Sequence, residues 1–362
     1  KELSAPTAMA AKAKNKKAMK TCTKKTMKEK KKKKLTQRAL EDAILKRCAT
    51  GRDQLDRKRP LGVKVVPVHP GSTGLQQFPR RWSRKEGGER MTRGAAEWYV
   101  PQGADTRRRM LFLHGGSFAL WAPQDAEYRS FGARLAHDCR VCVLSVDYRL
   151  SPEFFFPAAF DDTVAALQWI VTHGPDSPTE ESLAQDVFVA GDSAGGCLAV
   201  AACVAPDVTV RKVLRGVVGI SAWIDMTASG KSYETRQWDP SKCFGDATNA
   251  GNDREGGQGE AEVYLGRGGL KSFGRDWRAS PVFAPTARLR TMPPVLLQVG
   301  DYELLLDENI LLQKRMKKAG HTDATVRVYP RMWHCWHQYA NGGGAGQPLR
   351  KADEAMKEIG RW

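Results

Sequence analysis

The stretch "DVFVAGDSAGGCLAVAACVA", residues 186–205, joins two apolar segments through a polar, glycine-rich turn. Residues 187–190 are typical of a buried strand, and the small residues 197–205 suit a closely packed helix. The pentapeptide between them, GDSAG, has the pattern G-x-S-x-G, which exposes a serine hydroxyl above a sheet when a strand leads in and a helix leads out. The pattern therefore predicts a nucleophilic Ser193. The alternative is a glycine-rich turn that binds a phosphate.

Composition sets the size and charge of the molecule. The chain has 362 residues, of which 41% are hydrophobic, enough for one large α/β domain or two small ones. Residues 1–34 hold 14 Lys and 2 Glu, a charge of +12 out of the total +18. We expect these residues to form a disordered tail, because they have little apolar surface to bury. Three roles of this tail remain open: a nuclear signal, an organellar transit segment or a patch for anionic surfaces.

The remaining 328 residues carry 44 basic and 38 acidic side chains, a net charge of only +6. This charge does not imply a nucleic-acid partner, so no specific nucleic acid is expected. No apolar segment follows the first charges as in a secretory signal, and the longest weakly polar run contains Asp192 and three glycines. We expect no transmembrane segment and an intracellular, cytoplasmic location, with nuclear or organellar targeting left open by the tail.

The eight cysteines are scattered along the chain. Cys139 and Cys142 form one CxxC, but no second pair or nearby histidine completes a zinc site. We therefore expect buried, reduced thiols, no metal and no cofactor.

Apolar strand patterns alternate with helical ones. A helix is expected over residues 35–59 and irregular chain over 60–92. The expected strands are 96–101, 108–116, 140–148, 187–190, 216–225, 293–300 and 324–330, and the expected helices are 160–174, 197–205, 307–319 and 350–361. This alternation predicts an α/β fold, a mainly parallel sheet with helices on both faces. The polar, glycine-rich residues 231–272 break it and are expected to form a lid or a disordered loop.

A second glycine-rich segment, "LFLHGGSF", ends in a turn that follows a strand. Small residues there let backbone N–H groups point at one spot, as an oxyanion hole requires. We expect the N–H groups of Gly115, Gly116 and Ala194 to hold the oxyanion. His114 is expected to fix this loop and not to act in catalysis.

A serine nucleophile needs a base, and the base needs an acid to orient it. The segment "PPVLLQVGDYELLLDE" offers Asp301, Glu303 and Asp307 as the acid. The segment "VYPRMWHCWHQYA" offers His334 and His337 as the base. The residues alone leave these alternatives open.

The motifs together resemble the hormone-sensitive lipase family of α/β-hydrolases, which includes bacterial family IV esterases and arylacetamide deacetylases. The matching segments run in family order from about residue 97: "HGGSF", "VDYRLSPEFFFPAAFDD", "VAGDSAGG", "SAWIDMT", "RASPVFA", "PPVLLQVGDYELLLDE" and "MWHCW". The resemblance implies Ser193 as nucleophile, Glu303 as acid and His334 as base, with Asp301 and His337 as rivals.

The resemblance also implies the architecture. The expected α/β-hydrolase domain spans residues 35–362, with a cap from residues 35–96 and about 226–275. Its "VDYRLSPE" segment would brace the loop under the oxyanion hole through Asp147, Tyr148, Arg149 and Glu153. The three phenylalanines of residues 154–156 are expected to pack in the core. The chain departs from many relatives at Ser117, where they have glycine, and in the polar residues 231–262.

The function that this resemblance implies is a carboxylesterase, a serine hydrolase of short- to medium-chain acyl esters, about eight carbons or fewer. Its partner is a small-molecule ester. Other members of the superfamily are small-molecule receptors or dehydratases, and these remain the alternative. A nucleic-acid-binding protein is a third hypothesis that depends only on the lysine-rich tail. The sequence does not indicate an oligomeric state.

Overall fold

The computed structural model describes residues 36–49, 62–68, 82–84, 90–92, 96–176, 181–341 and 347–362. The chain divides into two units between residues 40 and 41, and the larger unit comprises residues 41–362. The expected disordered tail, residues 1–34, lies outside the described residues. The helix expected over 35–59 is described over α2 (Gln37–Cys48).

An eight-stranded sheet forms the centre of the large unit. Its strands follow the order β1-β4-β6-β5-β7-β8-β9-β10. The strand β4 pairs antiparallel with both β1 and β6, and all later pairs are parallel. The bounds are β1 (Val63–Val68), β4 (Ala96–Pro101), β5 (Arg108–Leu113), β6 (Cys142–Val146), β7 (Asp186–Asp192), β8 (Leu214–Ile220), β9 (Val295–Gly300) and β10 (Ala324–Tyr329). The mainly parallel sheet that the alternation predicts, and the α/β-hydrolase fold that the resemblance implies, are confirmed.

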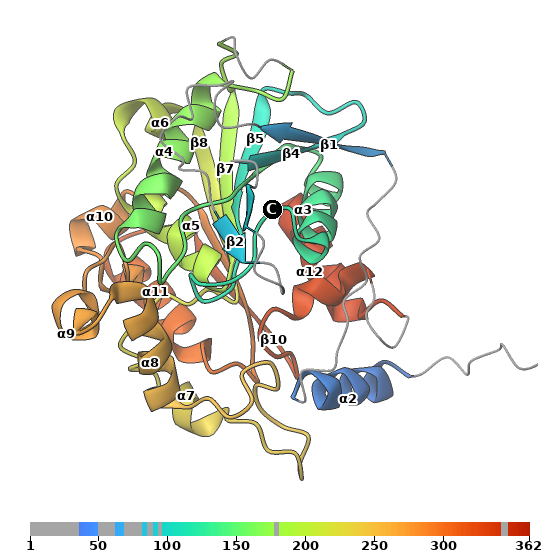
Figure 1. Ribbon diagram of the computed structural model, residues 1–362, viewed down its shortest axis with the longest axis vertical. Helices are drawn as coiled ribbons and strands as arrows, with labels where there is room; N and C mark the ends of the chain where they lie inside the picture. Colours follow the sequence, from blue (N-terminus) through green and yellow to red (C-terminus); the bar gives the residue numbers. More distant parts are fainter. Residues whose placement is uncertain are drawn as a thin grey trace, which may run out of the picture. The chain divides into compact units, whose positions relative to one another are not determined.

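Helices cover both faces of the sheet (Figure 1). On one face α4 (Ala158–Thr172) and α5 (Ala194–Val204) pack on the central strands, and α11 (Leu306–Lys318) packs on β9 and β10. On the other face lie α3 (Ala126–Cys139) and α12 (Arg350–Arg361). Every residue of α5 is buried, because the helix lies between the sheet and α4. Its small side chains allow this close approach.

The long insertion between β8 and β9 is helical, which corrects part of the sequence prediction. It contains α7 (Ser232–Thr235), α8 (Arg254–Leu265) and α9 (Gly269–Phe273), followed by the short helices η1 (Pro281–Phe283) and α10 (Thr286–Arg290). The helix α8 buries one face that includes Tyr264, whose ring stacks on Phe118 with 3.6 Å between centroids. The insertion is therefore anchored to the loop that follows β5.

Other elements also differ from the expectation. Residues 60–92 were expected to be irregular, yet β1 pairs with β4 at the edge of the sheet, and the short strands β2 (Trp82–Arg84) and β3 (Arg90–Thr92) pair with each other. The helix α3 was not predicted. Phe156 is buried, but Phe154 and Phe155 are exposed, so only one of the three packs in the core as expected.

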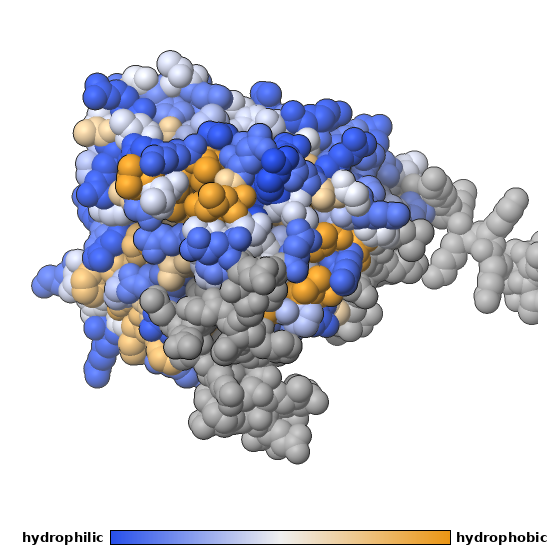
Figure 2. Space-filling view, turned by 90° about the horizontal axis from the view of Figure 1, so that it is seen from above, coloured by the Kyte–Doolittle hydropathy of each residue, from blue (hydrophilic) through white to orange (hydrophobic). Residues whose placement is uncertain are grey.

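The surface carries apolar groups in separate patches. Figure 2 views the molecule from the top of Figure 1 and shows these patches bordered by hydrophilic residues. Within the part of the chain that the structure describes, no helix combines the length and the apolar character that a membrane span needs.

Candidate active site

Ser193 lies on the turn between β7 and α5, as the sequence predicts. Its backbone has φ 54° and ψ −120°, a strained combination for a residue with a side chain. Two hydrogen bonds hold this conformation: the Ser193 N–H donates to the Ile220 carbonyl (2.9 Å), and the Trp223 N–H donates to the Ser193 carbonyl (3.0 Å). The turn therefore fixes the direction in which the hydroxyl points.

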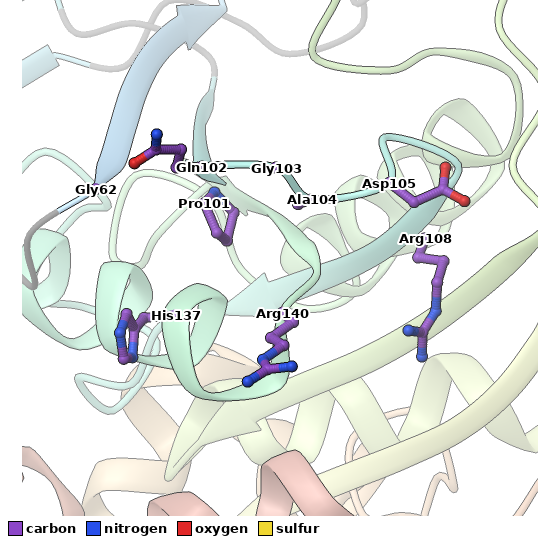
Figure 3. A pocket seen from close by; sticks show the side chains of 9 residues that line it. All are labelled: Gly62, Pro101, Gln102, Gly103, Ala104, Asp105, Arg108, His137 and Arg140. Carbon is purple, nitrogen blue, oxygen red and sulfur yellow. The ribbon is translucent and has the colours of Figure 1, made fainter.

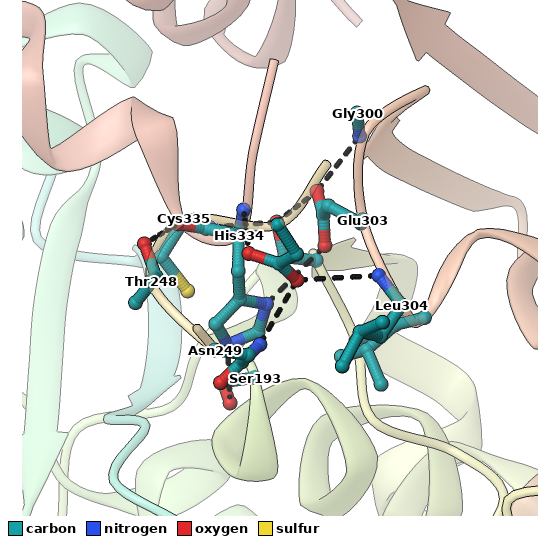
Figure 4. Close-up of polar contacts among 12 residues, drawn as sticks. Ser193, Thr248, Asn249, Gly300, Glu303, Leu304, His334 and Cys335 are labelled. Atoms are coloured by element: carbon teal, nitrogen blue, oxygen red, sulfur yellow. Dashed lines mark hydrogen bonds and ion pairs between the residues drawn. The ribbon is translucent and has the colours of Figure 1, made fainter. Parts of the chain in front are cut away.

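A chain of hydrogen bonds links the predicted nucleophile, base and acid (Figure 4). The Oγ of Ser193 lies 2.9 Å from Nε2 of His334. The Nδ1 of the same ring lies 3.2 Å from Oε2 of Glu303. The three side chains come from the turn after β7, the loop after β10 and the loop after β9. They meet because parallel strands place their carboxyl ends on the same side of the sheet.

Glu303 is fully buried and held by two donors. Its Oε1 accepts hydrogen bonds from the Ser221 hydroxyl and from the Gly300 N–H, both 2.7 Å long. The rival acid Asp301 accepts instead from the Arg331 backbone N–H. The rival base His337 lies 2.9 Å from the Gln298 side-chain oxygen. The structure thus brings Glu303 and His334 to Ser193 and places both rivals in other contacts.

Electrostatics favour a basic imidazole at His334. Burial by itself lowers the pKa of the His334 ring. The neighbouring Cys335 and Glu303 raise this pKa, and the net pKa lies well above its usual value. Burial raises the pKa of the Cys335 thiol to about 12, so this thiol is neutral near pH 7. The Glu303 carboxylate is therefore the neighbour that stabilises a protonated His334.

The loop after β5 corrects one expectation about the oxyanion hole. The Gly115 N–H donates to Oδ1 of Asp192 and to the Tyr128 hydroxyl, both at 3.0 Å. Asp192 is fully buried, and burial raises its pKa to about 6. Because Gly115 holds this carboxylate, its N–H is not directed at a reacting carbonyl. Gly115 anchors the loop and is not an oxyanion donor in this arrangement.

Three other backbone N–H groups face no acceptor among the described residues: those of Gly116, Ser117 and Ala194. Gly116 and Ala194 are two of the three expected donors. Ser117 has φ 51°, in the left-handed region that favours glycine, and lies where many relatives carry glycine. These three amides are the candidate oxyanion donors.

The loop is braced from below largely as expected. The His114 ring stacks on Tyr148 with 4.4 Å between centroids, and the Tyr148 hydroxyl donates to the His114 carbonyl (2.6 Å). Arg149 pairs with Asp162 at 2.7 Å. Glu153 is exposed. His114 and Tyr148 therefore shape the loop, in agreement with the structural role expected for His114.

Asp246, from the insertion, contacts both loops that carry the acid and the base. Its Oδ1 accepts from the His334 N–H and its Oδ2 from the Leu304 N–H, each at 3.2 Å. Thr248 adds a hydrogen bond from its hydroxyl to the His334 carbonyl (3.2 Å). The insertion thus holds the backbone positions from which His334 and Glu303 project.

A cavity of about 40 Å³ opens beside Ser193. Its lining is Ser117, Ser193, Trp223, Tyr233, Asn249, Asn252, Gly257, Glu260, Leu304, Leu305 and His334. A larger hollow of about 440 Å³ is lined by Pro101–Asp105 with Gly62, Arg108, His137 and Arg140 (Figure 3). That hollow lies where β5 begins, whereas Ser193 follows the end of β7. Because the two strands are parallel, the hollow lies at the opposite ends of the strands from Ser193. The smaller cavity is the candidate substrate site.

Sequence reasoning missed Ser221, Asp246 and Glu260. The place of Ser221 at the carboxyl end of β8, next to β7, was a usable signal. Asp246 and Glu260 lie in the glycine-rich insertion, where no hydrophobic pattern indicates which side chains face the site. No group of three or more His, Cys, Asp and Glu in the described residues is arranged to hold a metal ion. Cys142 is buried and Cys139 half-buried, and both are free thiols.

Comparisons with known proteins agree with this geometry. Residues 110–338 match the family model described as alpha/beta hydrolase fold. An acetyl-hydrolase of Streptomyces hygroscopicus is 36% identical over 250 residues, which cover 67% of this chain and 73% of that protein. An esterase of Acinetobacter venetianus is 26% identical over 78% of this chain and 81% of its own length.

Solved structures give the same family. An esterase from the bacterial hormone-sensitive lipase family is 27% identical with a TM-score of 0.63, covering 91% of this chain and 92% of its own.

A shorter sequence match is to a gibberellin receptor of Arabidopsis thaliana. It is 40% identical over 113 residues, which cover 30% of this chain and 28% of the receptor.

Proposed function

The chain belongs to the α/β-hydrolase family, in its hormone-sensitive-lipase-like group, and is a carboxylesterase; we propose that Ser193, His334 and Glu303 carry out its reaction. The observation that carries this proposal is the 2.9 Å contact between Ser193 Oγ and His334 Nε2. A nucleophile in hydrogen-bond contact with a base, itself oriented by a carboxylate, is the arrangement that acyl transfer needs.

In the proposed mechanism Ser193 Oγ attacks the ester carbonyl while His334 Nε2 takes its proton. The Glu303 carboxylate orients the ring and stabilises the imidazolium that forms. The N–H groups of Gly116, Ser117 and Ala194 hold the oxyanion of the tetrahedral intermediate. The imidazolium then gives its proton to the leaving alcohol, and an acyl-enzyme remains. Water activated by His334 attacks this ester and releases the acid.

The receptor alternative is disfavoured by the same contact. A binding protein does not need an intact base beside the serine, whereas His334 here is buried and bonded on both ring nitrogens. The receptor match also covers only 28% of that protein. We further propose that the enzyme prefers short acyl chains, because the cavity beside Ser193 is small and part of its wall is polar.

Replacing Ser193 with alanine tests the function. We expect Ser193→Ala to reduce turnover of 4-nitrophenyl acetate by on the order of 10⁶-fold, because the attacking atom is removed. The matched control is Ser241→Ala, an exposed serine of the insertion, which should keep full activity. Circular dichroism checks that both variants fold. A folded Ser193→Ala protein with unchanged turnover would rule out the serine mechanism.

A further inference from the structure

A carboxylate lies in the wall of the candidate substrate cavity. Glu260 projects from α8 and lines the same cavity as Ser193 and His334. It is the only Asp or Glu among the described lining residues, and none of these is Lys or Arg. This charge is not needed for the ester hydrolysis outlined above, so it requires another explanation.

The side chain of Glu260 is held in place by neutral donors. Its Oε2 accepts from the Ser117 hydroxyl at 2.9 Å, and its Oε1 accepts from the Asn252 amide at 2.7 Å. No Lys or Arg in the described part of the chain forms an ion pair with it. A carboxylate has about four acceptor positions, so two hydrogen bonds leave room for a further donor. Glu260 is thus oriented but not neutralised.

Ser117 gives a second observation that supports a built site. Its backbone has φ 51°, a conformation in which a side chain is strained and glycine is not. The side chain present there is the one that donates to Glu260. The chain therefore carries a strained serine on the oxyanion loop, and this serine fixes the carboxylate at the edge of the site.

The position of the charge predicts its partner. Ester hydrolysis places negative charge on the substrate oxygen, beside the Ser117 N–H. A nearby carboxylate that forms no ion pair with a described Lys or Arg opposes this charge, and the effect is strong in a half-buried site where water screens poorly. A positive group on the substrate offsets the repulsion between Glu260 and the oxyanion, and it donates hydrogen bonds to the acceptor positions of Glu260 that are not yet used. A hydroxyl group fills those positions but leaves the charge uncompensated.

We propose that Glu260, fixed by Ser117 and Asn252, is a specificity-determining residue that selects esters carrying a protonated amine close to the ester group. This inference extends the proposed function and depends on it. The amine belongs either to the acid or to the alcohol of the ester, and the cavity of about 40 Å³ admits only a small group in both cases. The shared chemistry is an ammonium a few atoms from the carbonyl.

The test compares charged and neutral esters of equal shape. On the acid side the pair is ethyl 3-aminopropanoate and ethyl butanoate, and on the alcohol side it is 2-(dimethylamino)ethyl acetate and 3-methylbutyl acetate. The measured quantity is the ratio of kcat/KM within each pair at pH 7, for the full chain and for Glu260→Gln. Intrinsic differences in ester reactivity cancel between the two proteins. Glutamine keeps the shape and still accepts from Ser117.

We expect Glu260→Gln to lower this ratio by about tenfold in one pair, through loss of a charge-assisted hydrogen bond to the substrate ammonium. The pair that responds identifies the side of the ester that carries the amine. The matched control is Glu255→Gln, an exposed carboxylate of the same helix, which should leave both ratios unchanged.

An equal effect of Glu260→Gln on the charged and neutral members of both pairs would overturn the inference. So would an equal loss of the ratio in Glu255→Gln, since that result would indicate a general surface charge. These outcomes differ from failure of the proposed function, in which folded Ser193→Ala would still hydrolyse the neutral esters.

Discussion

A methyl group at Gly195 would lie 2.0 Å from the Leu113 carbonyl oxygen, and one at Gly191 would lie 2.2 Å from the Gly195 carbonyl oxygen. No real Cβ atom tolerates such distances from backbone, so both positions require glycine. The close approach brings the turn of Ser193 against the end of β5, from which the oxyanion loop starts. Single residues therefore set the distance between nucleophile and oxyanion donors.

The acid is the residue whose assignment is easiest to test. We expect Glu303→Gln to reduce kcat by about 10³- to 10⁴-fold, because the amide removes the charge that stabilises the imidazolium and disturbs the ring tautomer. Asp301→Asn should have a much smaller effect, since Asp301 bonds to the Arg331 backbone and not to His334. Steady-state kinetics on 4-nitrophenyl acetate measure both. If the larger loss came from Asp301→Asn, the assignment of Glu303 as the acid would be wrong, while the roles of Ser193 as nucleophile and His334 as base would be unaffected.

The pH profile reports on the same pair. Neutral His334 is the form that accepts the serine proton, so kcat/KM falls as the pH drops through its pKa. Glu303 raises this pKa, and the net pKa lies above the ordinary value. Glu303→Gln removes that stabilisation of the charged ring. The residual activity of the variant should therefore persist to lower pH than that of the parent. An acid limb that stays in place or moves upward would contradict the geometry of the pair.

The sequence predicts those site residues whose chemistry demands one residue type at a recognisable place. Ser193 lies between required glycines, and His334 and Glu303 follow predicted strands. It does not predict that Gly115 uses its N–H to hold Asp192, because that depends on a buried carboxylate 77 residues away. Glu260 escapes prediction because its contact with Ser117 spans 143 residues.

At the level of elements, α8 shows packing overriding local preference. Its sequence REGGQGEAEVYL contains three glycines, each of which disfavours a helix by about 1 kcal/mol relative to alanine. The sequence therefore indicates a loop. The helix forms because Asp253 caps its first turn, accepting from the Gly256 N–H at 2.9 Å, and because Tyr264 packs on Phe118. The cap is local, but the contact of Tyr264 is with a residue far away along the chain, so hydrophobic periodicity within this segment does not indicate the helix.

Two glycines of α8 give a matched pair of substitutions. A Cβ at Gly259 meets nothing within 4 Å, so Gly259→Ala should stabilise the protein by about 0.5–1 kcal/mol through helix propensity. A Cβ at Gly257 would lie 2.9 Å from the buried Tyr233 ring, so Gly257→Ala should destabilise it and narrow the cavity that Gly257 lines. Denaturant unfolding measures the first effect, and kcat/KM the second. A gain in stability from both substitutions would show that the Tyr233 ring moves freely.

On the scale of the whole molecule, the alternation of strand and helix patterns is sufficient to predict the parallel centre of the sheet. Its edge is harder to predict, because β1 (VKVVPV) is only partly buried and contains Pro67. The substrate cavity is harder still. Its walls come from the oxyanion loop, the turn of Ser193, the insertion and the loops after β9 and β10. No single segment indicates its size, which emerges only when all of them are in place.

That size leads to the last prediction, which concerns acyl chain length. Each methylene buried in an apolar groove contributes about 0.8 kcal/mol, so a long groove would raise kcat/KM about fourfold per methylene. The cavity of about 40 Å³ instead holds little more than a small acyl group, and Ser117, Asn249, Asn252 and Glu260 make part of its wall polar. We therefore expect kcat/KM for 4-nitrophenyl esters to peak at about two to four carbons and to fall steadily at octanoate and dodecanoate. Ser193→Ala supplies the background rate for each ester. A value that keeps rising to dodecanoate would mean that the insertion opens into an apolar groove.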